Sequence, residues 1–153
     1  MKRLLTLIVL AAAAALAVTL AAGGTGAASS GGGKRIHVFE RATTDTPVDL
    51  PPAGDSLGDT LTFANEVFDA RSGKKVGSDQ GHCVRTVVGV AWECFWTTFL
   101  PRGQITVEGP FYDAADSTLA ITGGTGAYRN ARGTMDLHAR NATEFDFVFR
   151  VIG

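Results

Sequence analysis

The chain has 153 residues, of which 14 are lysine or arginine and 15 are aspartate or glutamate, so its formal net charge is −1 at pH 7. This charge balance gives no sign of nucleic-acid binding, which requires a clustered basic face, and because acidic and basic residues are mixed along the chain, no acidic tail is present. The length suits one domain with a core of its own.

The N-terminal segment has the layout of a secretory signal peptide. Met1-Lys2-Arg3 is a charged start, an apolar stretch runs from Leu4 to Ala22, and small residues follow as far as Gly33. The alternative is an uncleaved membrane anchor, because roughly 18 apolar residues can span a bilayer. The abundance of alanine and of small residues at the end of the stretch favours the signal peptide.

We expect cleavage near Ala27 or Ala28 and therefore a secreted, extracellular protein without a stable membrane span. In this interpretation residues 1–28 are the signal peptide, residues 29–34 are a flexible leader, and residues 35–153 are the folded domain.

After the leader the sequence predicts strands and no helix, because short alternating runs are separated by Gly, Pro, Asn and Asp turn signals. Residues 44–54, between the first two strands, are rich in Thr, Asp and Pro and predict a loop. The third strand contains Gly77 and Gly81, and we expect a bend at one of them. The eight predicted strands are 35–43, 59–69, 75–88, 91–100, 104–111, 118–122, 129–139 and 143–151.

Eight short strands at regular spacing predict an all-β domain, either a closed antiparallel barrel or a sandwich. A closed barrel leaves no exposed edge, and eight strands can enclose one small ligand.

Both cysteines, Cys83 and Cys94, lie in the exported part of the chain. Two cysteines outside the cytosol usually pair. If a hairpin turns near Val88-Gly89, the two residues stand opposite each other. We predict a disulfide, and the alternative is a free, reactive thiol at Cys83.

Alternate residues of a strand point to opposite faces, and the more apolar set should face the lumen. This assignment carries Asn65 inward with the apolar residues of its strand, and Glu40 inward with those of the first strand. A disulfide would place Arg85 on the same inward face. The predicted inward residues are Ile36, Val38, Glu40, Leu61, Phe63, Asn65, Val67, Cys83, Arg85, Val87, Trp92, Cys94, Trp96, Phe145, Phe147 and Phe149.

An apolar, aromatic lumen with a few polar side chains is the usual form of a small-molecule site. The alternative is a filled barrel in which the polar groups satisfy one another, with Glu40 and Arg85 as a buried ion pair. The candidate catalytic residues are Glu40, Asn65 and Arg85, and the candidate ligand contacts are Phe63, Trp92, Trp96 and Val38.

The segment Gly123–Gly133 has three glycines in its first four positions, which predicts a sharp corner between two strands. Its sequence, GGTGAYRNARG, resembles the signature of the dirigent and allene oxide cyclase superfamily. Gly58–Asn65, Val76-Gly77 with Gly81-His82-Cys83, and Gly103–Gly109 agree with that superfamily in the same order. The resemblance implies a closed eight-stranded antiparallel barrel rather than a sandwich.

Resemblance to plant allene oxide cyclases implies that Asn65 falls on their lumenal asparagine, Cys83 on their cysteine and Thr46-Pro47 on their Ser-Pro pair. Their inward glutamate falls on Val38, so the group expected to assist ring closure is missing. Glu40, two residues further along the same face, could substitute. Authentic allene oxide cyclase activity is therefore not expected.

Resemblance to dirigent proteins implies that Arg132 matches the arginine that helps a quinone methide to cyclise, with Asp59 as its acidic partner. We favour a structural role, in which Arg132 ties the glycine corner to Asp59 or Glu108. The residues of this structural motif are Gly123, Gly124, Gly126 and Arg132.

We expect a secreted, dirigent-like barrel that binds or steers a small apolar or aromatic molecule in its lumen without strong catalysis of its own. One alternative is an isomerase or cyclase that closes a ring on a reactive polyene or epoxide. The other is a structural or surface-interaction barrel with a filled core. The export signal weighs against a biosynthetic cyclase, since the similar bacterial pericyclic cyclases work inside the cell.

No cofactor, metal or nucleic-acid partner is expected. His37, His82 and His138 are scattered, without cysteines or carboxylates at metal-ligand spacing. The resemblance leaves a homo-oligomer open, because the plant relatives are trimers.

Overall fold

The computed structural model describes residues 33–152, so the predicted signal peptide and most of the predicted leader lie outside the described residues. The described part forms ten strands and one 3-10 helix, η1 (Gly126–Tyr128). No helix within residues 33–152 is long and apolar enough to cross a membrane. The strands are β1 (Lys34–Arg41), β2 (Thr46–Val48), β3 (Thr60–Phe63), β4 (Glu66–Asp69), β5 (Lys75–Val87), β6 (Ala91–Leu100), β7 (Gly103–Tyr112), β8 (Ser117–Gly124), β9 (Arg132–Ala139) and β10 (Glu144–Ile152).

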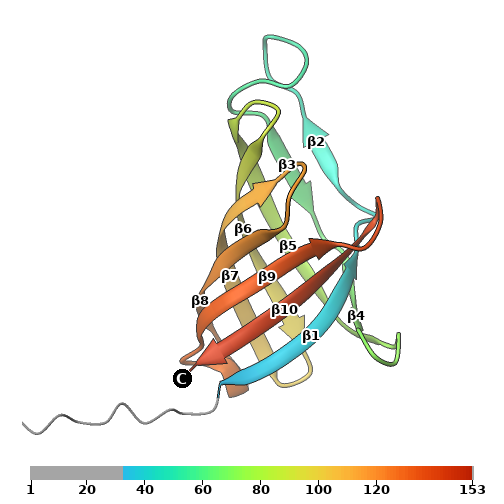
Figure 1. Ribbon diagram of the computed structural model, residues 1–153, viewed down its shortest axis with the longest axis vertical. Helices are drawn as coiled ribbons and strands as arrows, with labels where there is room; N and C mark the ends of the chain where they lie inside the picture. Colours follow the sequence, from blue (N-terminus) through green and yellow to red (C-terminus); the bar gives the residue numbers. More distant parts are fainter. Residues whose placement is uncertain (1–32, 153) are drawn as a thin grey trace, which may run out of the picture.

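The strands close into the predicted barrel (Figure 1). From β1 the antiparallel order runs through β10, β9, β8, β7 and β6 to β5. The ring then closes because β5 pairs with both β4 and β3, and β4 pairs with β1. Since β3 and β4 share one place in the wall, the eight-stranded antiparallel barrel is confirmed.

The predicted strand 59–69 is divided in two at Ala64-Asn65. The backbone N–H of Ala64 donates to the hydroxyl of Thr44 at 2.8 Å rather than to a neighbouring strand. The segment 44–54 was predicted to be a loop throughout, but Thr46–Val48 pairs with β3 as an additional edge strand. The same polar segment therefore both interrupts the wall and covers its edge.

The glycine corner is confirmed, and it packs against the turn between β6 and β7. The N–H of Ala127 donates to the carbonyl of Arg102 at 2.8 Å. Gly126 has φ +59°, and a Cβ there would lie 2.5 Å from that same carbonyl oxygen, so only glycine fits. Arg132 donates to the carbonyl of Ala131 at 2.7 Å. Within residues 33–152 it forms no ion pair, so the predicted tie to an acidic side chain is absent.

The inward faces form one apolar core, as the alternation predicts, except that Val87 is 49% exposed because the register of β5 with β6 shifts between Arg85 and Val87. The phenylalanine stripe of β10 lies in it, with Phe147 and Phe149 at most 1% exposed. β5 has an extra residue, Val76, where its register with β4 shifts between Val67 and Phe68. This irregularity is next to Gly77, one of the two positions where a bend is predicted.

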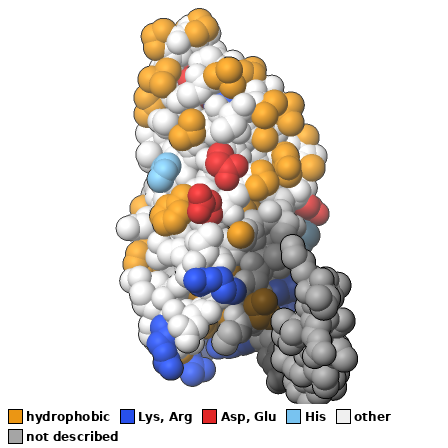
Figure 2. All heavy atoms as spheres, turned by 90° about the vertical axis from the view of Figure 1, so that its left-hand side faces the viewer, with side chains coloured by type: hydrophobic (Ala, Val, Ile, Leu, Met, Phe, Trp, Pro, Cys, Tyr) orange, Lys and Arg blue, Asp and Glu red, His pale blue; other side chains and the backbone are white. Residues whose placement is uncertain are grey.

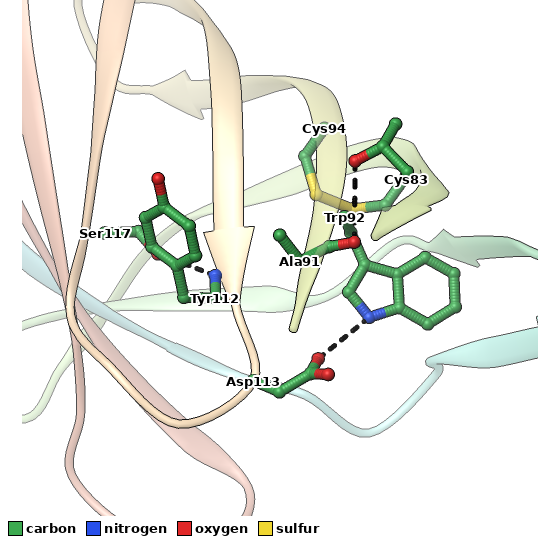
Figure 3. The surroundings of a disulfide bond; sticks show 8 residues. Cys83, Ala91, Trp92, Cys94, Tyr112, Asp113 and Ser117 are labelled. Atoms are coloured by element: carbon green, nitrogen blue, oxygen red, sulfur yellow. Dashed lines mark hydrogen bonds between the residues drawn. A yellow bond between two sulfur atoms is a disulfide. The ribbon is translucent and has the colours of Figure 1, made fainter. Parts of the chain in front are cut away.

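The predicted disulfide is present and joins directly opposed residues of β5 and β6 (Figure 3). Cys83 and Cys94 are each at most 3% exposed, and the cysteine α-carbons are 4.0 Å apart. The alternative of a free thiol at Cys83 is therefore wrong.

Replacing both cysteines by alanine should lower the free energy of unfolding by about 3 kcal/mol, because the bridge removes loop-closure entropy from the unfolded chain. Chemical denaturation of the double variant and the oxidised wild type measures this difference. The reduced wild type should match the double variant, which should not respond to reductant. Equal midpoints for the oxidised wild type and the double variant would contradict a stabilising bridge.

Candidate functional site

The barrel contains a cavity that opens at the end where β1 stops and β10 begins. It encloses about 50 Å³, or about 410 Å³ when the atom-free space at its open mouth is included. Its aromatic side chains contact one another. The ring centroid of Trp96 lies 6.1 Å from that of Phe63 and 5.5 Å from that of Phe147. The lining residues are Glu40, Asp45, Leu61, Phe63, Cys83, Cys94, Trp96, Phe111, Leu137, Phe145 and Phe147.

Asn65 holds the polar part of the cavity wall together. Its side chain is 1% exposed. The amide oxygen accepts hydrogen bonds from the backbone N–H groups of Thr43 and Thr44 at 3.0 Å and from the Thr44 hydroxyl at 2.9 Å. The amide nitrogen donates to Glu40, and to Asp45 at 2.8 Å. Because three donors surround the oxygen, the amide NH₂ group is directed at the two carboxyl groups.

Glu40 is a buried carboxyl that titrates near neutrality. It lies on the inward face of β1 and is 7% exposed. Burial disfavours the charged form and raises its pKa from 4.5 to about 7, while the hydrogen bond from Asn65 lowers the pKa and the charge of Asp45 raises it. Both protonation states are therefore populated at pH 7, which suits a general acid or base.

Asp79, on β5, is a second buried carboxyl of the same network. Its backbone exchanges two 3.0 Å hydrogen bonds with the backbone of Asn65, and its side chain is 1% exposed. Burial raises the pKa of Asp79 from 3.8 to about 9, and the charge of Glu40 adds to the increase. Asp79 is therefore neutral at pH 7. Within the described chain its Oδ2 atom has no hydrogen-bond partner.

The structure brings together four of the predicted site residues. Glu40 and Asn65 are hydrogen-bonded, and Phe63 and Trp96 line the cavity beside them. Val38, predicted as a ligand contact, is 3% exposed and packs in the core without lining this cavity.

Arg85 and Trp92 do not line the cavity, contrary to the prediction. Figure 3 shows Trp92 beside the disulfide, with its indole directed at Asp113. They are opposed in the register of β5 and β6, two residues nearer the hairpin turn than the disulfide. The guanidinium group pairs with Asp55 at 2.6 Å and Asp113 at 2.7 Å, and it lies 4.0 Å from the centroid of the Trp92 ring. The indole N–H also donates to Asp113, at 3.1 Å. The alternative of a buried Glu40–Arg85 ion pair is wrong, because Asp55 and Asp113 from the loops engage the arginine.

Two carboxyl groups of the site, Asp45 and Asp79, were not predicted from the sequence. Asp79 carried a usable signal, because it precedes Cys83 by four residues and alternation places both on the inward face. Asp45 carried none, since it lies in a loop where alternation gives no direction.

Exposed apolar side chains gather on one side of the barrel end that bears the cavity. Figure 2 shows hydrophobic side chains in the upper part of one face and lysines and arginines in its lower part. Leu57 is the most exposed of these apolar residues at 67%. They come from the loop before β3, the β5–β6 hairpin and the end of β7, and they are Val48, Leu50, Leu57, Val87, Val88, Val90 and Tyr112.

The arrangement of the site suits proton transfer, because a carboxyl with both protonation states available stands at the wall of an aromatic cavity. Within residues 33–152, no three His, Cys, Asp or Glu side chains are grouped so that they could hold a metal ion.

Proteins whose solved structures share this barrel have several different activities. A pyocyanin demethylase is 27% identical, with a TM-score of 0.67 over 76% of this chain and 100% of its own. A pterocarpan synthase dirigent protein is 16% identical, with a TM-score of 0.63 over 78% of this chain and 88% of its own. The exo-specific intermolecular Diels-Alderase AbnU is also 16% identical, with a TM-score of 0.64 over 80% of this chain and 100% of its own. The sequence matches one protein family across residues 37–148, and the chain belongs to that family, the allene oxide cyclase barrel-like domains.

Proposed function

We propose that this protein is a secreted barrel that binds a small planar aromatic molecule at its mouth and exchanges a proton with it through Glu40. The observation that carries the proposal is the buried Glu40 carboxyl, whose pKa is raised to about 7 at the wall of an aromatic cavity.

Acid–base catalysis is most efficient when the pKa of the group lies near the working pH. Asn65 supports this role because its NH₂ group fixes the carboxyl of Glu40 while its oxygen is anchored to Thr43 and Thr44. A fixed carboxyl beside a bound ring supplies orientation, which can account for much of a rate enhancement.

One of the similar proteins supports the proposal of an aromatic ligand. The demethylase named above acts on pyocyanin, a planar phenazine, and its whole length matches this chain at 27% identity. The dirigent protein and the Diels-Alderase, at 16% identity, support the barrel alone. The disulfide is compatible with an exported protein, because such bridges persist in oxidising compartments.

The size of the cavity favours a second candidate, a structural barrel with a filled core. The enclosed 50 Å³ is well below the roughly 150 Å³ cavity that takes up a benzene ring. A three-ring ligand would therefore rest largely in the open mouth, against Phe111 and Phe145, whose rings pack edge to face with centroids 6.1 Å apart. Ligand binding therefore decides between the two candidates.

Glu40→Gln should leave binding of an uncharged aromatic ligand intact and slow any proton-dependent conversion of the ligand by about 100-fold or more. Glutamine keeps an oxygen that accepts the hydrogen bond from Asn65, so the fold should be preserved. Binding of pyocyanin is followed by quenching of tryptophan fluorescence, and conversion by its visible absorbance.

The control is Glu108→Gln, which removes an exposed carboxylate on the outer face of β7 and should change neither measurement. The filled barrel would be favoured if the wild type does not bind pyocyanin and if planar aromatic compounds do not raise its thermal denaturation midpoint. An unchanged rate of ligand conversion in Glu40→Gln would show that Glu40 does not take part in the reaction.

A further inference from the structure

We infer that the cavity selects a positively charged planar aromatic ligand over neutral and anionic ligands of the same shape. This inference rests on the proposed function and adds the charge of the ligand to it.

The lining combines carboxyl groups with aromatic rings. Glu40 and Asp45 are the charged residues of the cavity wall, which includes no lysine, arginine or histidine among the described residues. Aromatic faces attract cations through the ring quadrupole, and carboxylates attract them directly. The aromatic residues of the wall are Phe63, Trp96, Phe111, Phe145 and Phe147.

Three carboxyl groups of one network face a single small region. Asp45 approaches Glu40 from the loop after β1, and Asp79 approaches from β5, with Asn65 between them. The neighbouring strands present apolar groups there, since Phe145 lies opposite Glu40 in the register with β10 and Val67 lies opposite in β4. The network therefore lacks a positive charge, and a cationic ligand would supply one.

The arginines at this end of the barrel are already neutralised. Arg85 pairs with Asp55 and Asp113. Arg41 pairs with Glu144 at 2.9 Å, and Arg140 pairs with an aspartate of β10 at the same distance. None of the three is free to attract an anionic ligand.

Charge is also divided between the two ends of the barrel. The loops around the mouth carry Asp45, Asp49, Asp55, Asp59, Asp113 and Asp116. Basic side chains gather at the opposite end, and the lower part of Figure 2 shows some of them. This separation creates a field that guides cations toward the mouth and repels anions from it. The basic residues are Lys34, Arg35, Arg71, Lys74, Arg102 and Arg129.

Three phenazines of similar shape test the inference: the 5-methylphenazinium cation, neutral phenazine and phenazine-1-carboxylate. Their dissociation constants are measured by calorimetry in the dark, at pH 8 and low salt. The cation should bind at least about tenfold more tightly than phenazine, and the anion should bind most weakly.

Asp45→Asn should weaken binding of the cation at least about threefold more than binding of phenazine, because one charge is lost while an oxygen that accepts the hydrogen bond from Asn65 remains. Glu108→Gln is the control and should alter none of the three. At pH 7 binding of the cation should also release protons, since a positive charge lowers the pKa of Glu40. Proton release is measured by repeating the titration in buffers with different ionisation enthalpies.

Phenazine binding as tightly as the cation would overturn the inference and leave the proposed function standing. Equal weakening of cation and phenazine by Asp45→Asn would do the same. Failure of all three phenazines to bind would overturn the proposed function and the inference together.

Discussion

Asn65→Ala should lower the free energy of unfolding by about 3–5 kcal/mol, one of the largest losses expected for a single substitution in this chain. The substitution leaves two backbone N–H groups without their acceptor and two carboxyl groups without their donor. It also releases the segment that carries Asp45 from the wall. Chemical denaturation at pH 7 measures the loss.

The matched control is Asn141→Ala, which removes an asparagine from the exposed turn before β10, where its hydrogen bonds are short-range. We expect this variant to lose less than about 1 kcal/mol, as is usual for surface positions. An Asn65→Ala variant no less stable than Asn141→Ala would show that Asn65 does not hold the wall together.

The second large effect is a fall in stability as the pH rises from about 4 to about 9. Both buried carboxyls have a pKa raised by folding, Glu40 from 4.5 to about 7 and Asp79 from 3.8 to about 9. Between the unfolded pKa and the folded pKa of each group, the folded state binds more protons than the unfolded state, so each rise in pH favours unfolding. The contribution of each group is fully present below its unfolded pKa and is lost as the pH passes its folded pKa.

Asp79→Asn should flatten this profile and raise the thermal midpoint at pH 9 by at least about 5 °C, because an uncharged amide replaces a carboxyl that ionises while buried. At pH 4, where the aspartate is protonated, the two proteins should differ little. Thermal denaturation from pH 4 to pH 9 provides the comparison.

The control is Glu93→Gln, which removes an exposed carboxylate of β6 that forms no ion pair among the described residues and should leave the slope of the profile unchanged. Carboxylates whose pKa values are lowered by hydrogen bonds, such as Asp59 and Asp69, affect stability below about pH 4 and do not mask the effect. A wild type that gains stability from pH 5 to pH 9 would contradict the buried acidic pair.

The strands and their faces follow largely from local sequence. Alternation places Phe147 and Phe149 in the core because a one-residue slip would expose the whole apolar set. The disulfide follows from the short hairpin between its cysteines. The corner follows from its glycines, since a side chain at Gly126 would collide with the turn between β6 and β7. These features depend on residues close in sequence or on strict periodicity.

The site was predicted less completely because its polar contacts cross between distant segments. Arg85 has the inward direction that alternation predicts, yet its partners Asp55 and Asp113 come from loops whose paths alternation does not describe. The position of Asp45 likewise depends on hydrogen bonds to Asn65, twenty residues away. The volume of the cavity depends on how the rings around Trp96 pack.

The central claim is that Glu40 is a proton-exchanging group at the wall of a ligand cavity, and its carboxyl can be observed directly. A carbon-13 NMR titration of the glutamate side chains, assigned with Glu40→Gln, gives its pKa with and without 5-methylphenazinium. We predict a midpoint near pH 7 in the free protein that falls when the cation binds. A midpoint near pH 4.5 that the cation leaves unchanged would contradict the account.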